Sequence, residues 1–435
     1  LQLSTANATA VTLDTLPTRL VSLDLDMDTG VLNMSFSEPV NVLSVLPSAV
    51  TLSDAVNSSN THVLADTQVV GSGFAQTVAL QLGDKDIRDL KLARICLFRD
   101  SCTFSSNATM ARDAAGLYLP AVSEAPIDGT FVADSTPPFL PDRGFLYFNL
   151  NNGTLALSFS EVVNVSSVQP TRIVLQSYFE TPEVTYTLTG GSVLSGYHPG
   201  PASTAVVIAL SDTDANAIKA AQGLCTSRAT CFMSVYSSLV ADMNGNEATA
   251  AALTPPFRAS QAYVADTTEP GLVSVEVDMD GGELVLEFDE TVSAISLQPT
   301  LLTLQTAPWA GASAYSANYT LTGGSVTALS TTTLRVTMLT ANVQAIKALD
   351  LCLDPAAADN CTLSAGAGFI QDTALTPNQA LAIAPSSPAN VSAITPDTTA
   401  PRLSAFNLDI DAGVMLITFN EPVRRESVTV TEMTL

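Results

Sequence analysis

The stretch LVSLDLDMDTGVLNMSF, residues 20–36, decides the fold. Apolar and polar side chains alternate in it on both sides of an Asp-Thr-Gly turn at residues 28–30. A period of two is typical of strands with one buried face, and a short Asp/Gly turn between two such runs predicts a β-hairpin. We therefore expect Leu32 and Met34 to point inward and Asn33 to point outward.

The hairpin belongs to a pattern that occurs four times. Each copy opens with an Asp/Thr-rich segment that ends in proline, and its second strand ends in Phe-x-Glu. The openers begin at Asp14, Asp134, Asp266 and Asp397, and the strand ends carry Glu38, Glu161, Glu290 and Glu421. Successive openers lie 120, 132 and 131 residues apart, which is the size of a domain.

Later motifs keep the same order within the copies. The second and third copies share Tyr-Thr-Leu-Thr-Gly-Gly-Ser-Val, at 186–193 and 319–326, and then Asn/Gln-Ala-Ile-Lys, at 216–219 and 344–347. The first copy has degenerated at this place to Asp86-Ile-Arg-Asp-Leu90. Each copy closes with an Asp-rich segment, of which only Asp242-Met-Asn-Gly-Asn246 has Gly-Asn; Asp113 and Asp372 lack it.

This periodicity predicts the domain organisation. We expect the tail of a preceding repeat at 1–13, complete repeats at 14–133, 134–265 and 266–396, and the first strands of a partial repeat at 397–435, within a longer parent chain.

Each repeat is expected to be a β domain. About seven short strands per repeat, with only a short helical turn near Ile218 and Ile346, are typical of a two-sheet sandwich. The fold class is therefore all-β, with tandem sandwich repeats of about 120 to 132 residues in an elongated array.

The opener, the Phe-Ser-Glu-Pro-Val hairpin and the closing Asp-x-x-Gly-Asn element resemble the immunoglobulin-like repeats of large surface and S-layer-type proteins. The fuller pattern, with Tyr-Thr-Leu-Thr-Gly-Gly, Asn-Ala-Ile-Lys and a cysteine pair, is similar to repeat-built extracellular proteins of algae and other protists, including hair or mastigoneme-like filaments. The resemblance covers essentially the whole chain. It implies immunoglobulin-like sandwiches with a structural role.

Composition excludes several partners. The 435 residues include 42 acidic and 17 basic side chains, for a formal charge of -25. Such a charge repels the phosphates that dominate nucleic-acid affinity, and it disfavours anionic membrane surfaces. No apolar run approaches the ~18 residues of a spanning helix, so we expect no membrane insertion in this segment.

Six cysteines occur as one close pair in each complete repeat: Cys96 with Cys102, Cys225 with Cys231, and Cys352 with Cys361. The regular position predicts three local disulfides and an oxidising, extracellular compartment. A metal site would need a denser Cys/His cluster. The alternative is reduced, partly buried cysteine in an intracellular protein.

Nine Asn-x-Ser/Thr sequons support the same compartment. They begin at Asn7, Asn33, Asn57, Asn107, Asn152, Asn164, Asn318, Asn360 and Asn390. We expect N-glycosylation of several of them in a eukaryotic source. Because their positions differ between repeats, the glycans would form a solvating coat.

Catalysis has little basis in the sequence. His62 and His198 lie at unrelated places of two repeats, where each is expected to be an isolated loop residue. No nucleotide-binding or nucleophile motif occurs. We expect no enzyme activity and no cofactor.

Calcium is the one ligand that the pattern leaves open. Carboxylates alternate at Asp24, Asp26 and Asp28, at Asp278 and Asp280, and at Asp409 and Asp411, whereas the second repeat has Asn149, Asn151 and Asn152. Hard oxygen ligands suit Ca²⁺, but alternate strand positions also form a solvated face next to a hairpin turn, which is the interpretation we favour. The block of acids therefore predicts no metal site, with structural calcium as the alternative.

The recurring glutamates at Glu38, Glu161, Glu290 and Glu421 have three interpretations. They bind metal, they bridge neighbouring domains, or they accept backbone N–H groups at the strand exit. The last interpretation is favoured.

Repeats without a repeated reactive constellation predict a structural array. We expect an extracellular, glycosylated filament or surface-fibre subunit that self-associates into a homopolymeric fibre. The alternatives are the stalk of a cell-surface adhesin or receptor, and an accessory array on a secreted polysaccharide-acting enzyme.

Overall fold

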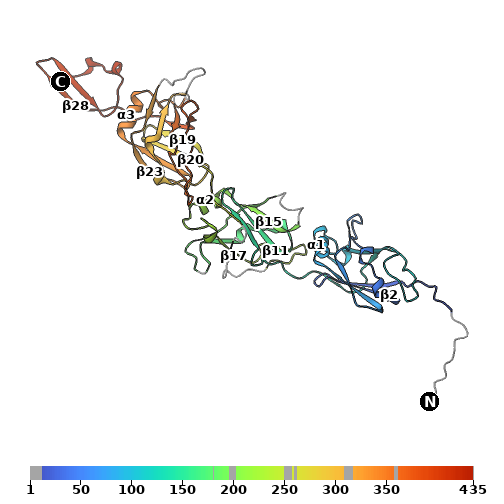
Figure 1. Ribbon diagram of the computed structural model, residues 1–435. Helices are drawn as coiled ribbons and strands as arrows, with labels where there is room; N and C mark the ends of the chain where they lie inside the picture. Colours follow the sequence, from blue (N-terminus) through green and yellow to red (C-terminus); the bar gives the residue numbers. More distant parts are fainter. Residues whose placement is uncertain are drawn as a thin grey trace. The chain divides into compact units, whose positions relative to one another are not determined.

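The computed structural model describes residues 12–179, 181–194, 202–248, 257–258, 262–307, 317–356 and 361–434. The chain divides into two compact units, one formed by 1–148, 154–210 and 231–262, the other by 149–153, 211–230 and 263–435. The second repeat contributes to both units. Figure 1 shows the order of strands and helices along the chain.

The first repeat contains two mixed or antiparallel sheets. The five-stranded sheet has the order β5 (Thr67–Val70), β6 (Phe74–Leu82), β2 (Val31–Asn41), β1 (Leu20–Asp26), β9 (Phe131–Val132). The four-stranded sheet has the order β4 (Thr61–Val63), β3 (Val50–Asp54), β7 (Cys102–Ser106), β8 (Val122–Pro126). The described residues of this repeat thus form nine strands, two more than the expected seven.

The predicted hairpin is confirmed as β1 and β2. They pair antiparallel, with Leu25 opposite Leu32, so that apolar side chains share one face. Leu32 and Met34 are fully buried and Asn33 is not. Gly30 closes the turn at a φ of 69°, a conformation that costs glycine little.

The second and third repeats reproduce this order. In the second, one sheet has the order β14 (Ser192–Val193), β15 (Ala202–Ala209), β11 (Thr154–Asn164), β10 (Phe145–Asn149), β18 (Ala262–Val264). The other sheet has the order β13 (Thr185–Thr187), β12 (Ile173–Gln176), β16 (Phe232–Val235), β17 (Phe257–Arg258). In the third, the orders are β23 (Gly324–Ala328), β24 (Thr333–Met338), β20 (Glu283–Phe288), β19 (Leu272–Asp278), β27 (Ala393–Thr395), and β22 (Asn318–Thr320), β21 (Leu302–Gln305), β25 (Thr362–Ala365), β26 (Ala389–Asn390).

The two sheets of a repeat enclose a common core. In the first repeat, Leu25 and Leu32 from one sheet share a buried cluster with Leu52 and Phe104 from the other. The third repeat has the corresponding cluster. The chain is therefore a tandem series of all-β sandwiches, followed by a lone hairpin of β28 (Leu403–Asp409) and β29 (Val414–Phe419).

Each complete repeat also has one short α-helix: α1 (Asp84–Ala93), α2 (Asp212–Ala220) and α3 (Thr340–Ala348). The expected helical turns near Ile218 and Ile346 are thus regular helices of nine residues. The segment 86–90, predicted to have degenerated, lies within α1, and its Leu90 is buried as Ile218 and Ile346 are.

Short 3-10 turns follow the long strands and complete the secondary structure: Val42–Ser44, Pro47–Ala49, Arg99–Ser101, Val165–Ser167, Pro170–Arg172, Arg228–Thr230, Ala294–Ser296, Pro299–Leu301, Arg425–Ser427 and Val430–Glu432. Among the described residues, none of the helices has both the length and the apolarity needed to cross a membrane.

Candidate functional site: lysine clusters between successive repeats

Each helix carries a buried polar side chain and, five residues later, a lysine. The pairs are Asp86 and Lys91 in α1, Asp214 and Lys219 in α2, and Asn342 and Lys347 in α3. All three anchors are fully buried, and the lysines recur at a constant interval of 128 residues. The anchor fixes the helix on its sandwich, so the lysine leaves each repeat at the same place.

The contacts of Asn342 show how an anchor works. Its Oδ1 accepts hydrogen bonds from the Tyr319 hydroxyl at 3.0 Å and from the Thr322 hydroxyl at 2.7 Å, and its Nδ2 donates to the Gly323 carbonyl at 2.9 Å. These partners belong to the recurring Tyr-Thr-Leu-Thr-Gly-Gly motif. In the third repeat, the motif therefore holds the helix.

Asp86 has the same role in α1 with different partners. Its carboxylate accepts from the backbone N–H groups of Ala65 and Asp66 and, at 2.6 Å, from the Thr67 hydroxyl. His62 Nε2 lies 2.8 Å from Asp86 Oδ1. The expectation of an isolated loop histidine at His62 is thus wrong, because β4 presents it to a buried carboxylate; His198 lies outside the described residues.

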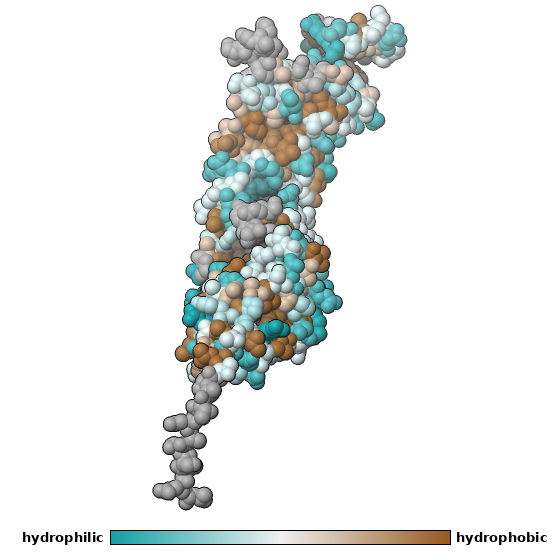
Figure 2. Space-filling view, turned by 90° about the vertical axis from the view of Figure 1, so that its right-hand side faces the viewer, coloured by the Kyte–Doolittle hydropathy of each residue, from teal (hydrophilic) through white to brown (hydrophobic). Residues whose placement is uncertain are grey.

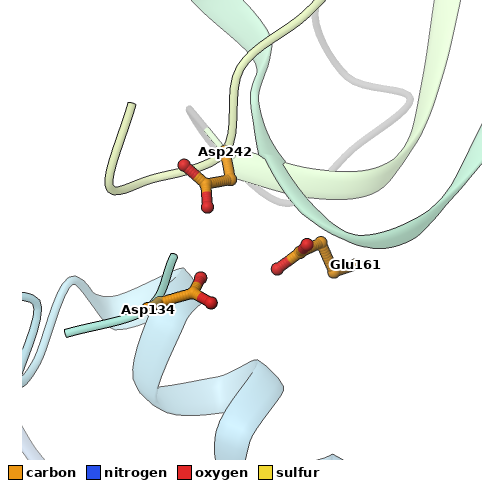
Figure 3. Close-up of side chains that lie close together, drawn as sticks. All are labelled: Asp134, Glu161 and Asp242. Atoms are coloured by element: carbon orange, nitrogen blue, oxygen red, sulfur yellow. The ribbon is translucent and has the colours of Figure 1, made fainter. Parts of the chain in front are cut away.

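The first lysine cluster consists of Lys91, Asp134, Glu161 and Asp242. Lys91 Nζ lies 2.7 Å from Asp134 Oδ2 and 2.6 Å from Glu161 Oε2, and the lysine side chain is only 7% exposed. Oxygens of the three acids lie within 4.8 Å of one another, and Figure 3 shows the carboxylates directed toward a common centre. Lys91 belongs to the first repeat and the three acids to the second, so the cluster joins them.

The second lysine cluster repeats this arrangement with Lys219, Asp266, Glu290 and Asp372. Lys219 Nζ lies 2.9 Å from Asp266 Oδ2 and 2.5 Å from Glu290 Oε2. The carboxylates of Asp266 and Glu290 are 2% and 7% exposed, so this cluster is shielded from solvent as well as the first one is. It joins the second repeat to the third.

The third lysine cluster consists of Lys347, Asp397 and Glu421. Lys347 Nζ lies 2.7 Å from Asp397 Oδ2 and 3.0 Å from Glu421 Oε2. Asp397 is 20% exposed, more than its counterparts in the first two clusters. The partial repeat thus receives its lysine from the third repeat in the same way.

Burial and mutual repulsion control the protonation of the acids. Burial raises the pKa of Glu161, and in the second cluster burial, with the neighbouring Asp266 and Asp372, raises the pKa of Glu290 to about 7 against the pull of Lys219. Burial disfavours a charged lysine, but the hydrogen bonds that Lys91 donates to the acids outweigh burial and raise the pKa of Lys91. Each lysine therefore stays charged, and in the second cluster Glu290 gives up its proton only as the pH rises to about 7.

The closing segment holds the opener from its other side. Asn246 Nδ2 donates to the backbone carbonyl of Asp134 at 3.0 Å and to Asp242 Oδ2 at 2.8 Å. In the third repeat Asn378 makes the same two bonds, to Asp266 and Asp372. The third repeat thus has this element despite lacking Gly-Asn, because a longer loop brings a later asparagine to the same place.

A second set of bonds, here called the linker caps, fixes the residues after the opener aspartate. Asp28 accepts from the backbone N–H groups of Ser135 and Thr136 at 2.8 and 3.1 Å, and from both hydroxyls. The bonds from the Ser135 hydroxyl and backbone and from Thr136 lower the pKa of Asp28 to about 2. The equivalent caps are Asn151 with Thr267 and Thr268, and Asp280 with Thr398 and Thr399.

The linker caps change the interpretation of the alternating acids. Asp26 closes its own hairpin turn, as expected, by accepting from Asp28 and Thr29 backbone N–H groups. Asp24 and Asp28 are not merely solvated, because Asp24 accepts from the Thr130 backbone N–H and Asp28 binds the linker. Asn151 replaces Asp28 in the second repeat, which shows that the cap needs a hydrogen-bond acceptor and no charge.

Direct packing adds to the first junction. Leu97 of the first repeat forms a buried apolar cluster with Val162 and Met243 of the second, and its carbonyl accepts from Asn244 Nδ2 at 2.9 Å. Helix α1 also contacts β11 (Figure 1). At the second junction, Thr291 donates through its backbone N–H to Asn216 Oδ1 at 3.0 Å.

The acid groups Asp134/Glu161/Asp242 and Asp266/Glu290/Asp372 have the chemistry of a hard-cation site. In both, however, a lysine ammonium lies within 3 Å of two of the acids. The ammonium occupies the position that a metal would take. The arrangement is a salt-bridge lock, with no nucleophile and no open coordination position among the residues that form it.

The recurring glutamates thus bridge neighbouring repeats, which is the alternative rather than the favoured interpretation. Glu161, Glu290 and Glu421 bind a lysine of the preceding repeat, and no backbone N–H among the described residues donates to their carboxylates. Lys91, Lys219 and Lys347 are not predicted as site residues. A signal exists in the sequence, because a basic residue at a constant interval is notable in so acidic a chain.

The described sequon asparagines all lie at the surface. Five are exposed and Asn33 and Asn164 are half-buried; the exposed ones are Asn57, Asn107, Asn152, Asn318 and Asn390. Asn7 and Asn360 lie outside the described residues. Disulfides join Cys96 to Cys102 and Cys352 to Cys361, and Cys225 and Cys231 are disulfide-bonded as well. Three disulfides indicate an oxidising compartment.

No protein-family model and no curated protein matches the chain. Among solved structures, it is similar to the N-terminal part of the bacterial S-layer protein SbsC, at 13% identity over 45% of this chain and 44% of that one, with a TM-score of 0.20. A longer SbsC structure, residues 31–844, matches at 10% identity over 93% of this chain and 63% of that one, with the same TM-score. The chain spans less than two thirds of these proteins. Likenesses at this TM-score support no inference about function, and the all-β architecture rests on the chain's own sheets.

Proposed function

We propose that the chain is a structural subunit of an extracellular, glycosylated filament or surface fibre built from head-to-tail immunoglobulin-like sandwiches. One observation carries the proposal: the same lysine cluster and the same linker cap recur between successive repeats. Bonds that serve only to fix one repeat on the next are those of a spacer or polymer. A stack of independent binding modules would not need them.

The surface also supports association with other molecules. Figure 2 shows apolar patches among polar ones on the viewed face, and side chains such as Leu43, Val56 and Ile295 are at least three-quarters exposed. Leu43 and Ile295 occupy the same 3-10 turn in the first and third repeats. Exposed apolar side chains at this position of the first and third repeats offer contacts along a fibre, whereas the second repeat has Ser166 there.

Electron microscopy of the native material tests the proposal. We expect filaments or a surface layer with an axial repeat that matches a whole number of sandwiches. Isolated particles without lateral or longitudinal polymer would contradict it and favour the adhesin-stalk alternative. Intact-mass measurement before and after glycosidase treatment tests the glycans, and an unchanged mass would eliminate them.

A further inference from the structure

The first repeat carries an unoccupied copy of the acceptor half of a lysine cluster. Its opener acid, strand-exit acid and closing acid are Asp14, Glu38 and Asp113, here called the acceptor face. They correspond in sequence to Asp134, Glu161 and Asp242 of the first lysine cluster and to Asp266, Glu290 and Asp372 of the second.

The backbone places Glu38 and Asp113 as in the occupied clusters, whereas Asp14 is exposed and is not gathered with them. Asp113 forms an isolated β-bridge with Val40, two residues after Glu38. Asp242 with Val163, and Asp372 with Val292, form the same bridge two residues after the corresponding glutamate. Asp14 Oδ1 accepts from the N–H of the second residue after it at 3.0 Å, as Asp134 and Asp266 do.

One oxygen of the acceptor face is buried without a hydrogen-bond partner. Asp113 is 3% exposed; its Oδ1 accepts from the Leu117 backbone N–H, but its Oδ2 has no hydrogen-bond partner. No lysine or arginine nitrogen of the described chain lies within ion-pair distance of Asp113 or Glu38. In the occupied clusters the corresponding oxygens, Asp242 Oδ2 and Asp372 Oδ2, accept from asparagine Nδ2 groups, and an ammonium pairs with the two neighbouring acids. The buried carboxylate of Asp113 has neither kind of partner among the described residues, which is costly.

The surroundings of the acceptor face are uncovered too. In the first junction, Val162 and Met243 follow the cluster acids directly and are buried against Leu97. The residues that follow Glu38 and Asp113, Pro39 and Ala114, are exposed. Within the part of the chain that the structure describes, no cation pairs with these acids and no residue covers Pro39 or Ala114.

We propose that the acceptor face binds the helix lysine of another sandwich of this design and so forms a further lysine cluster. The occupant must present one ammonium from the last turn of a short helix, because that is the donor in every occupied cluster. The inference rests on the proposed head-to-tail array. Its failure would leave polymerisation through other surfaces intact, which microscopy detects separately.

The test frees a donor lysine within the full chain. Asp397→Asn with Glu421→Gln removes both acids that hold Lys347, and this donor variant, labelled with ¹⁵N, is mixed with unlabelled wild-type chain. A carbodiimide then couples carboxylates to amines in direct contact, and peptides are identified by mass spectrometry. We expect conjugates between labelled Lys347 and unlabelled Glu38 or Asp14, the counterparts of the acids that contact the lysine in the occupied clusters, together with a dimer in sedimentation velocity.

Controls within the chain make the result decisive. The conjugate should fall at least tenfold when the acceptor carries Glu38→Gln and disappear when the donor also carries Lys347→Met, whereas acceptor Glu124→Gln should leave it unchanged. The Lys91–Glu161 conjugate reports coupling efficiency in every sample. Two results would overturn the proposal. One is detection of the Lys91–Glu161 conjugate without any Lys347 conjugate, and the other is a Lys347 conjugate that Glu38→Gln does not reduce.

Discussion

Lys91 is the side chain on which the first junction depends most. Removing the cation leaves Asp134, Glu161 and Asp242 buried together without compensation. We expect Lys91→Met to destabilise this junction by about 3 kcal/mol, the scale of a broken buried ion pair. Thermal unfolding with hydrogen exchange at the linker measures the loss.

The matched control is Lys85→Met in the same helix. Lys85 is half exposed and, among the described residues, pairs only with Asp89 one turn away, a solvent-exposed contact that contributes little to stability. Equal effects of the two substitutions would show that the helix, and not the cluster, is what the lysine stabilises.

Glu290 makes the second lysine cluster sensitive to pH. Burial and the neighbouring acids raise its pKa to about 7 from an ordinary value of 4.5. The folded state then binds this proton more tightly than the unfolded state, so the group's contribution to stability falls as pH rises from about 4.5 to about 7. The melting temperature of Glu290→Gln minus that of wild type should therefore be larger at pH 8 than at pH 5. A difference that does not change with pH would contradict this assignment.

At the scale of the element, the hairpin turns serve as linker caps. Asp28→Ala removes the acceptor for the Ser135 and Thr136 N–H groups. Their amide exchange should accelerate roughly five- to tenfold, since a hydrogen bond is worth about 1 kcal/mol. Asp28→Asn should retain most of the protection, because Asn151 caps the next linker naturally.

The two variants also differ in acid. Because the pKa of Asp28 is lowered from 3.8 to about 2 in the folded chain, the contribution of Asp28 to stability is present above pH 3.8 and is lost as the pH falls toward 2. Asp28→Asn should lack this loss. If the amide protection of Ser135 and Thr136 decayed equally in wild type and in Asp28→Asn between pH 4 and pH 2, another group would control the linker.

The elements could be predicted only where the signal is local. The period-two alternation at residues 20–36 is sufficient for β1 and β2, because one-face burial dictates that pattern. Helix α1 is hidden because Arg88 and Asp89 stand where the second repeat has Asn216 and Ala217. The buried Leu90 and the anchor Asp86 are what the first helix shares with the others, besides its lysine. The lysine clusters require knowing that residues about 70 positions apart meet, which a single sequence does not state.

For the whole molecule, calcium removal is the test of what fills the acid clusters. Lys91 and Lys219 already supply the cation in the first two clusters, and Ser135 and Thr136 occupy Asp28. We expect chelation with EDTA to leave the melting profile unchanged. A decrease of several degrees that added Ca²⁺ reverses would show that a metal competes with the lysines.

The donors and acceptors also give every repeat a direction. A lysine lies toward the following repeat and acids lie toward the preceding one, with the same chemistry at each junction. Because the junctions use the same residues, the repeats are interchangeable. A chain in which repeats were duplicated, deleted or reordered would still place a lysine next to a set of acids at each junction. Total length could thus change during evolution by recombination between copies, without any need to invent a new joint.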